Sequence, residues 1–211
     1  MAELPILYSF RRCPYAIRAR LALRVAGIKA QLREVLLKDK PQEMLQASPK
    51  ATVPVLVVGS RAIEQSLDIM QWALDQHDPE RWAEMPEEGW RLIAENDGPF
   101  KEALDRTKYA DRHSSDPEQE RKKATAFLHT IGEVAGNGAY LFGPSPSVAD
   151  MALLPFIRQF AAVDRPRFDA ESPRWVQHWL DQFLQSDRLA QVMKKYPKWA
   201  TGDPVTVFPD Q

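Results

Sequence analysis

The 211-residue sequence has a single cysteine, no long apolar run and almost no net charge. One cysteine, Cys13, forms no internal disulfide, which suits a reducing compartment. No window approaches the ~20 apolar residues that a membrane helix needs. A net charge of −1, without a long basic run, argues against a nucleic-acid partner. We therefore expect a cytoplasmic protein with no membrane and no nucleic acid among its partners.

Two further absences limit the chemistry. Position 16 carries alanine, so Cys13 lacks the second thiol of a C-x-x-C motif. Any disulfide that Cys13 forms must therefore join it to another molecule. The four histidines are scattered, with no second ligand at metal spacing, and we expect no metal site.

Cys13 lies where a strand is expected to end and a helix to begin. Ile6–Tyr8 is an apolar run typical of a buried strand, and apolar residues then recur at helical spacing as far as the glycine at 27. Pro14 suits the first helical position, which makes Cys13 the N-cap. The free amide hydrogens and the dipole of that helix, together with Arg11 and Arg12, favour the thiolate. We interpret Cys13 as a catalytic nucleophile with a pKa below the free-cysteine value of about 8.5.

The rest of the chain divides into a mixed block and a helical block. Residues 1–78 predict the order βαβαββα, and the proline- and charge-rich residues 79–87 predict a linker. Residues 88–211 predict an all-helical domain with no further strand and an extended tail from Thr201. Within it, helices are expected over residues 88–112, 116–134, 147–163 and 173–195, the first interrupted at Asn96–Pro99 and the last near Ser186.

Five motifs occur together along this chain: Cys13-Pro14, Lys38–Pro41, Val53-Pro54, Gln65-Ser66 and Ser147–Asp150. Their types and separations resemble those of the cytosolic glutathione transferases. The Arg-Arg-Cys-Pro-Tyr-Ala sequence is similar to the cysteine-type branch, which includes the omega class, dehydroascorbate reductases, intracellular chloride channel proteins and two-domain glutaredoxins. The resemblance implies an α/β N-terminal thioredoxin-like domain, an all-α helical-bundle domain and a homodimer.

The resemblance also implies roles for individual residues. The backbone of Val53, before a proline that could be cis, would bind the cysteinyl part of glutathione. Gln65 and Ser66 would hold the γ-glutamyl end at a helix N-terminus, and Lys40 would reach the glycyl carboxylate. Gln65 stands where the cysteine-type branch usually has glutamate, so the transferase class stays open.

Other residues have competing interpretations. Tyr8 could activate glutathione, as in tyrosine-type transferases, but a strand tyrosine is more simply explained by core packing. Arg18 and Arg20 could attract anionic glutathione, although alternating charges usually mark a solvated helix face.

Two more groups of residues are placed by position. Phe10, Arg11, Lys108 and Tyr109 are candidates for a second-substrate pocket. Ser147–Asp150 has the spacing of a capping box, and we expect it to have a structural role.

The favoured function is that of a glutathione-dependent thiol transferase in which Cys13 attacks a mixed disulfide or an S-glutathionyl electrophile. One alternative is conventional conjugation of glutathione to electrophiles through Tyr8 or Ser9. Another is a non-catalytic binding protein of the same fold. The first two hypotheses need glutathione as co-substrate, and none needs a metal.

Overall fold

The structure is a computed structural model that describes residues 3–136 and 138–210. Its contacts divide the chain into two compact units. The first joins Met1–Glu80 to Asp187–Gln211, and the second is Arg81–Ser186. This division differs from the predicted boundaries, because the last part of the chain belongs with the first.

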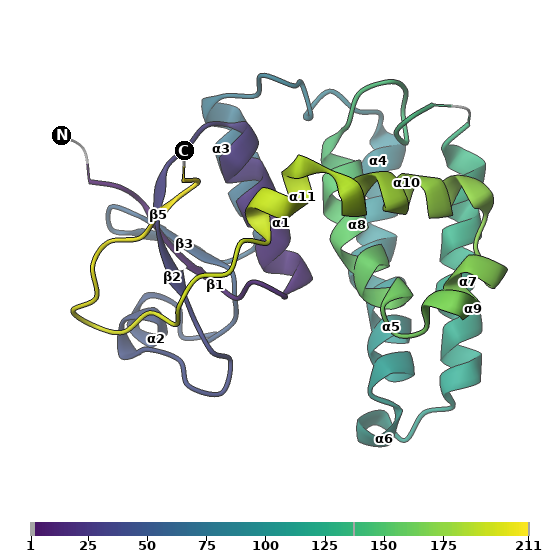
Figure 1. The fold of residues 1–211 in the computed structure, drawn as a ribbon, viewed down its shortest axis with the longest axis horizontal. Coiled ribbons are helices and arrows are strands. Elements are labelled where there is room, and N and C mark those ends of the chain that lie inside the picture. The colour runs from purple at the N-terminus through teal and green to yellow at the C-terminus, as the bar shows by residue number, and fades with distance from the viewer. Residues whose placement is uncertain (1–2, 137, 211) are drawn as a thin grey trace. The chain divides into compact units, whose positions relative to one another are not determined.

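A five-stranded sheet forms the centre of the first unit (Figure 1). Its strands are β1 (Ile6–Ser9), β2 (Ala30–Glu34), β3 (Val55–Val58), β4 (Arg61–Ile63) and β5 (Val207–Phe208). The order across the sheet is β4-β3-β1-β2-β5. β1 and β2 are parallel, and the other neighbouring pairs are antiparallel. The predicted order βαβαββα over the first block is confirmed.

The helices of this unit are α1 (Pro14–Val25), α2 (Gln42–Ala47), α3 (Ser66–Gln76) and α11 (Asp187–Val192). Figure 1 shows α1 and α3 packed together on one side of the sheet, with α2 on the other. α1 begins at a proline, which needs no amide partner there, and the chain turns away at Gly27, whose φ of 68° favours glycine. Between the sheet and α1 and α3 lies a core that includes Leu7, Ile17, Leu21, Leu32, Leu56, Ile69 and Met70.

The prediction that no strand follows residue 88 is wrong. Val207 and Phe208 pair with β2, and the Leu32 N–H donates to the Thr206 carbonyl oxygen at 2.8 Å. Further up the chain, the Trp199 N–H donates to the Glu34 carbonyl oxygen at 2.8 Å. A two-residue strand is too short to show an alternating pattern, so only tertiary pairing reveals it. The extended tail thus covers the β2 edge of the sheet.

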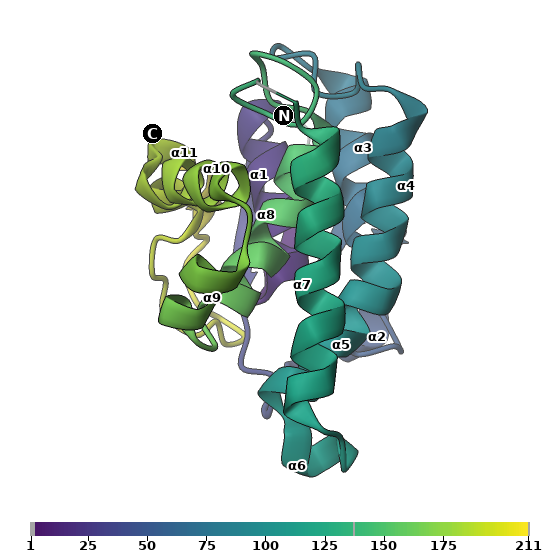
Figure 2. The ribbon, with the colours of Figure 1, turned by 90° about the vertical axis from the view of Figure 1, so that its right-hand side faces the viewer.

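The second unit is helical. Its elements are α4 (Glu87–Glu95), the π-helix η1 (Asn96–Phe100), α5 (Lys101–Lys108), α6 (Ala110–His113), α7 (Pro117–Val134), α8 (Val148–Ala161), α9 (Arg165–Glu171) and α10 (Arg174–Gln185). α4 packs against α8, and α5 packs against α7, as Figure 2 helps to follow. Aromatic side chains fill much of the core, among them Trp82, Phe100, Phe156, Phe160, Phe168 and Trp179.

Two predicted interruptions of the helices are confirmed. The first falls at η1, where Pro99 lies inside the helix and the wider π-turn accommodates a residue without an amide hydrogen. The second falls at Ser186, between α10 and α11. The short helix α9 was not predicted; Asp164 caps it by accepting the Arg167 N–H at 3.1 Å.

The predicted capping box at the start of α8 is also confirmed. The Ser147 hydroxyl accepts the Asp150 N–H, and Asp150 accepts the Ser147 N–H at 2.8 Å. The carboxylate of Asp150 also accepts the Leu141 N–H at 3.0 Å and the Trp179 indole N–H at 3.1 Å. Burial raises the pKa of Asp150, and these neutral donors oppose that shift.

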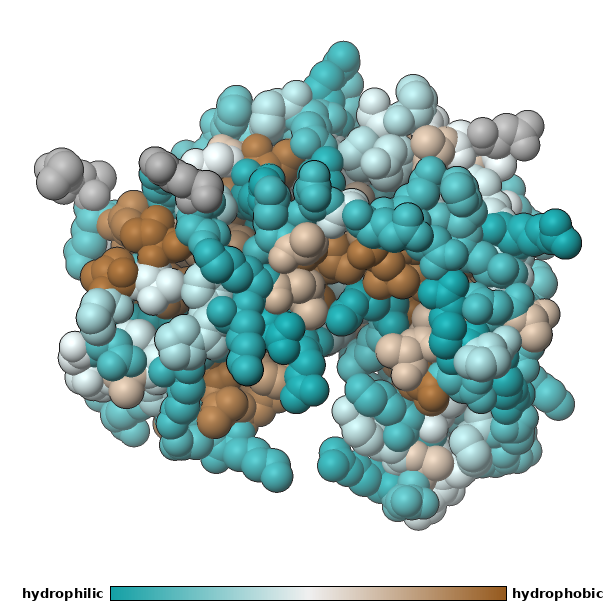
Figure 3. All heavy atoms as spheres, viewed as in Figure 1, coloured by the Kyte–Doolittle hydropathy of each residue, from teal (hydrophilic) through white to brown (hydrophobic). Residues whose placement is uncertain are grey.

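Among the described helices none is long and apolar enough to cross a membrane. In Figure 3 the visible face is mainly hydrophilic, and separate apolar patches interrupt it.

Candidate active site

Cys13 occupies the position that the sequence indicates. It is the N-cap of α1, with φ −72° and ψ 124°, and Pro14 is the first helical residue. Cys13 is half-buried, and its backbone N–H donates to the Phe10 carbonyl oxygen at 2.9 Å. We call Phe10–Cys13, between β1 and α1, the Cys13 loop. It places a half-buried cysteine at the positive end of a helix.

Val53 lies next to this sulfur. Cys13 Sγ is 3.8 Å from the Val53 carbonyl oxygen, so the thiol form can donate a weak hydrogen bond to it. The Val53-Pro54 peptide bond is cis, as the sequence allowed, and Pro54 directly precedes β3. Val53 belongs to a buried apolar cluster against which Phe10 and Cys13 pack.

Gln65 and Ser66 begin α3, as predicted. Gln65 is the exposed N-cap, and Ser66 is the first helical residue and is 5% exposed. The Ser66 hydroxyl accepts a hydrogen bond from Arg18 Nη1 at 3.4 Å. Glu64, just before them, accepts from Ser48 Oγ at 2.5 Å, and this hydrogen bond lowers the pKa of Glu64. The start of α3 is therefore tied to both α1 and the segment after α2.

The interpretation of Arg18 and Arg20 as a solvated helix face is wrong. Both side chains are 0% exposed. Arg18 lies with its guanidinium carbon 5.5 Å from the Tyr15 ring centroid, in addition to its contact with Ser66. Each arginine is buried because a polar partner on another element accepts its hydrogen bonds. Charge alternation in the sequence cannot reveal such partners.

Tyr8 packs in the core, which was the favoured interpretation. It is 2% exposed, and its ring meets Trp199 edge-on at a centroid distance of 6.4 Å. Arg33 Nη1 donates to the Tyr8 hydroxyl at 2.6 Å. Burial raises the pKa of Tyr8, and the charge of Arg33 opposes the shift. The phenol is thus neutral at physiological pH and already engaged by Arg33.

Ser9, the other alternative to Cys13, is completely buried. Its hydroxyl accepts a hydrogen bond from Arg20 Nε at 2.8 Å. The Ser9 hydroxyl is thus engaged by Arg20 inside the first unit. Of the three candidate nucleophiles or thiol activators, Cys13 alone is partly exposed.

The remaining predicted residues fall into two groups. Lys40, half-buried, comes just before Pro41, the N-cap of α2. Phe10 packs beside Cys13, whereas Arg11 Nη1 donates to the Met193 carbonyl oxygen at 3.4 Å. The structure thus brings Phe10, Cys13 and Val53 together within the first unit.

Lys108 and Tyr109 belong to the helical unit. The Lys108 ammonium lies 5.0 Å from the Tyr109 ring centroid, at the end of α5. Arg112 also contacts Tyr109, with its guanidinium carbon 4.7 Å from the Tyr109 ring centroid. A pocket that unites these residues with Phe10 and Arg11 stays a prediction.

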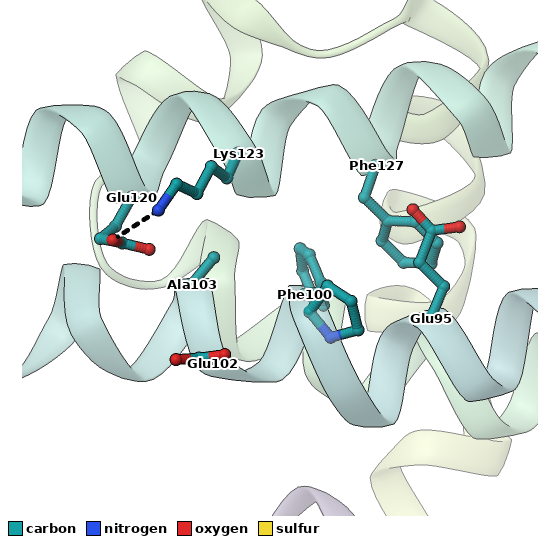
Figure 4. A pocket seen from close by; sticks show the side chains of 8 residues that line it. Glu95, Phe100, Glu102, Ala103, Glu120, Lys123 and Phe127 are labelled. Atoms are coloured by element: carbon teal, nitrogen blue, oxygen red, sulfur yellow. Dashed lines mark hydrogen bonds and ion pairs between the residues drawn. The ribbon is translucent and has the colours of Figure 1, made fainter.

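A cavity of about 230 Å³ lies between η1–α5 and α7 in the helical unit (Figure 4). Phe100 and Phe127 supply apolar walls, and the Glu120–Lys123 ion pair, at 2.8 Å, lies at one end. Glu95 and Glu102 add two carboxylates to the lining. The cavity is acidic and partly apolar.

Metal ligands are not gathered in the described parts of the chain. Across residues 3–136 and 138–210, histidine, cysteine, aspartate and glutamate side chains form no group of three that could hold a metal ion. The polar side chains near the Cys13 loop contact one another instead.

Glu34, beside the Cys13 loop, was not among the predicted site residues, and its ion pair with Arg20 was not expected. The Arg20 guanidinium forms an ion pair with Glu34, and the Arg11 backbone N–H donates to the second oxygen of Glu34 at 2.6 Å. A signal was present: Glu34 shares its strand face with Leu32, and Arg20 lies on the same helix face as Ile17. Opposite charges at inward positions of neighbouring elements favour a buried ion pair.

This geometry agrees with comparisons to known proteins. Two family models match, "Glutathione S-transferase, N-terminal domain" over residues 7–82 and "Glutathione S-transferase, C-terminal domain" over residues 101–182. The chain belongs to the glutathione S-transferase family, and it is a glutathione transferase-like enzyme.

Relatives in sequence come from plants and animals. The chain is 25% identical over 196 residues to a probable glutathione S-transferase, parA, of Nicotiana tabacum, covering 88% of this chain and 87% of that one. It is also 25% identical over 203 residues to glutathione S-transferase omega-1 of Mus musculus, covering 89% and 79%.

Solved structures show the same fold. Glutathione transferase Omega 3C of Trametes versicolor superposes with a TM-score of 0.78 at 21% identity, covering 95% of this chain and 93% of that one. A family member from Pseudomonas fluorescens, solved with two glutathione molecules bound, gives a TM-score of 0.75 at 20% identity, covering 90% and 92%.

Proposed function

We propose that this protein is a glutathione-dependent thiol transferase with Cys13 as its nucleophile. The observation that carries the proposal is the placement of the chain's single cysteine, half-buried at the N-cap of α1 and 3.8 Å from the Val53 carbonyl oxygen. Helix amides and neighbouring arginine charge favour the thiolate there. The omega-type relative supports a cysteine-based activity.

The reaction proceeds in two balanced exchanges. The Cys13 thiolate attacks the glutathione sulfur of a mixed disulfide, the old sulfur–sulfur bond breaks, and the leaving thiolate takes a proton from water. A second glutathione, as its thiolate, attacks the glutathione sulfur of the enzyme adduct. Glutathione disulfide leaves, and the Cys13 thiolate returns. Glutathione supplies both electrons, so no other reductant is needed.

Glutathione would lie from the Cys13 loop to the start of α3. The Val53 backbone would bind its cysteinyl part, Gln65 and Ser66 its γ-glutamyl end, and Lys40 its glycyl carboxylate. The exposed Gln65 and the α3 N-terminus support this placement, because free amide hydrogens suit a carboxylate.

The surroundings of Tyr8 and Ser9 favour this function over conjugation through either hydroxyl. Arg33 engages the Tyr8 hydroxyl, and Arg20 engages that of Ser9. A neutral phenol can still donate a hydrogen bond to a sulfur, so the two functions need an assay that separates them. The rate at which glutathione is conjugated to a halogenated aromatic electrophile would measure the conjugating function.

The deciding experiment compares the wild type with Cys13→Ser in both assays. We expect the variant to lose reduction of a small glutathione mixed disulfide, because a hydroxyl forms no disulfide intermediate. A variant that reduced the mixed disulfide at the wild-type rate would exclude Cys13 as nucleophile. Unchanged conjugation with no reduction in the wild type would favour the Tyr8 or Ser9 alternative.

We also propose a homodimer, which is typical of the family. Sedimentation equilibrium at micromolar concentration measures the mass of the assembly directly. A mass near 24.1 kDa, that of one chain, would contradict the proposal.

A further inference from the structure

A buried ion pair lies behind the Cys13 loop. Arg20 of α1 is 0% exposed and Glu34, at the end of β2, is 9% exposed. Besides Glu34, the Arg20 guanidinium donates to Ser9 Oγ at 2.8 Å and to the Val192 carbonyl oxygen at 3.0 Å. Arg20 therefore joins the end of β1, the end of β2 and the end of α11.

The second oxygen of Glu34 holds the loop itself. The Arg11 backbone N–H donates to it at 2.6 Å, across 23 residues of sequence. The residue after Glu34 adds a second link, because the Val35 N–H donates to the Ser9 carbonyl oxygen at 2.8 Å. The loop then closes with the Cys13 N–H bonded to the Phe10 carbonyl oxygen. The backbone two residues before Cys13 is thus fixed by a carboxylate that Arg20 keeps in place.

We propose that Glu34 and Arg20 are positioning residues for Cys13, holding its loop so that the sulfur stays aligned with the first turn of α1. This inference rests on the proposed function, in which Cys13 is the nucleophile. Glu34 contacts the loop through the Arg11 amide, and Arg20 acts on the loop through Glu34. An N-cap sulfur gains its stabilisation as a thiolate from short-range contact with helix amides, so a displaced loop forfeits it.

A simple charge effect predicts a different result. The charged groups around the loop include Arg11 and Arg12 on the loop, Arg20 on α1 and Glu34 on β2. The titratable Tyr196 interacts electrostatically with Arg20 and Glu34 as well. Removing only the carboxylate makes the region more positive, which lowers the pKa of a nearby thiol. Removing both members of the ion pair leaves the net charge unchanged. A higher thiol pKa in the double variant would therefore come from the loop and not from charge.

The test uses the double variant Glu34→Met/Arg20→Met. A single change at Glu34 would leave Arg20 buried without its carboxylate and can unfold the protein, whereas replacing a whole buried pair by apolar residues is often tolerated. The matched control is Glu171→Met/Arg121→Met, which removes the ion pair between α7 and α9 in the helical unit. Circular dichroism melting would report whether each variant folds.

Cys13 is the chain's only cysteine, so the pH dependence of iodoacetamide alkylation reads this thiol alone. We expect the midpoint in the Glu34/Arg20 double variant to rise by about 0.5 to 1 pH unit and the rate at pH 7 to fall about three- to tenfold. The control should keep the wild-type midpoint.

A folded Glu34/Arg20 double variant with the wild-type midpoint would overturn the proposal. So would an equal rise in the control, since that would show a general loss of stability. Alkylation involves neither glutathione nor a disulfide. An unchanged midpoint in the double variant would therefore reject the positioning role even if the wild type reduces the mixed disulfide. A raised midpoint would support the positioning role even if the wild type reduces no disulfide.

Discussion

Each of the two units ties neighbouring elements together with an arginine–glutamate pair. In the first unit Arg20 meets Glu34, with side chains 0% and 10% exposed. In the helical unit Arg121 meets Glu171 at 2.7 Å, with side chains 3% and 31% exposed. The chemistry of the two pairs is the same. The first joins the consecutive elements α1 and β2, and the second joins α7 to α9.

Their neighbours differ. The second carboxylate oxygen of Glu34 accepts a hydrogen bond from the Arg11 amide of the Cys13 loop. Glu171 instead accepts a hydrogen bond from a second guanidinium, that of Arg167, at 3.0 Å. Burial lowers the pKa of Arg20, although Glu34 opposes it. Burial raises the pKa of Glu171, but hydrogen bonds from Arg121 and Arg167 outweigh it, and the pKa is lowered. One ion pair thus holds the loop of the proposed nucleophile, and the other joins two helices.

If this contrast holds, changes in the first unit should affect chemistry and changes in the second should affect stability. The largest effect is expected at Cys13. Cys13→Ala should abolish reduction of a glutathione mixed disulfide, because the covalent intermediate cannot form. Tyr8→Phe should keep most of the activity, since the Tyr8 ring packs and its hydroxyl contacts Arg33. Initial rates of both purified variants would measure this. Comparable losses of activity in the two variants would contradict the prediction that Cys13, and not Tyr8, carries the reaction.

In the helical unit, Asp150→Ala should give the largest loss of stability. Its carboxylate accepts hydrogen bonds from Ser147, Leu141 and Trp179, and the variant leaves these buried donors unsatisfied. We expect a loss of about 3–5 kcal/mol in the free energy of unfolding. Urea unfolding would measure it, with Asp164→Ala, a cap with one hydrogen bond to the Arg167 amide, as the control at about 1 kcal/mol. Equal losses in both variants would contradict the special role of Asp150.

A smaller effect is expected for Ser66→Ala in the first unit. Losing a hydrogen bond to a charged ligand group costs about 1.5–3 kcal/mol, or roughly a ten- to hundredfold weaker affinity. Because that contact is the same in ground and transition states, KM for glutathione should rise while kcat stays nearly constant. Steady-state kinetics would show the split, and Ser172→Ala in the helical unit should change neither constant. A collapse of kcat with KM intact would remove Ser66 from the glutathione site.

The smallest effect concerns pH and Glu171. Since its pKa is lowered in the folded state, its contribution to stability is full above the ordinary value of 4.5 and is lost as pH falls through the folded value. Glu171→Gln should therefore make the loss of stability below pH 4.5 shallower. The disulfide reductase activity at pH 7 should not change. Urea unfolding at several acidic pH values would measure the slope, and an unaltered slope would show that Arg121 and Arg167 do not stabilise this carboxylate.

Much of the fold could be predicted because its signals are local. Pro14 predicts a helix start, and the Ser147–Asp150 spacing predicts a cap; both are set within four residues. The position of Cys13 follows from the same local rule. These features need no knowledge of where the rest of the chain lies.

What could not be predicted depends on contacts between distant segments. Arg20 is buried because Glu34, Ser9 and Val192 accept its hydrogen bonds, and these lie on three other parts of the chain. The pairing of Phe208 with Ala30 likewise joins the two ends of the sequence. Periodicity measures one segment at a time, so it assigned an arginine to solvent and a strand to an extended tail.

The strand β5 has a consequence for how the protein is made. Its unit is assembled from Met1–Glu80 and Asp187–Gln211, with all of Arg81–Ser186 between them along the chain. A nascent chain that has just completed α3 still has an open β2 edge, and Trp199 has not yet reached Tyr8. Such long-range closure slows folding, and an unpaired strand edge is prone to aggregate. The helical unit, whose contacts are contiguous in sequence, can fold before the unit that carries Cys13 is complete, because that unit is finished only after β5 has been synthesised.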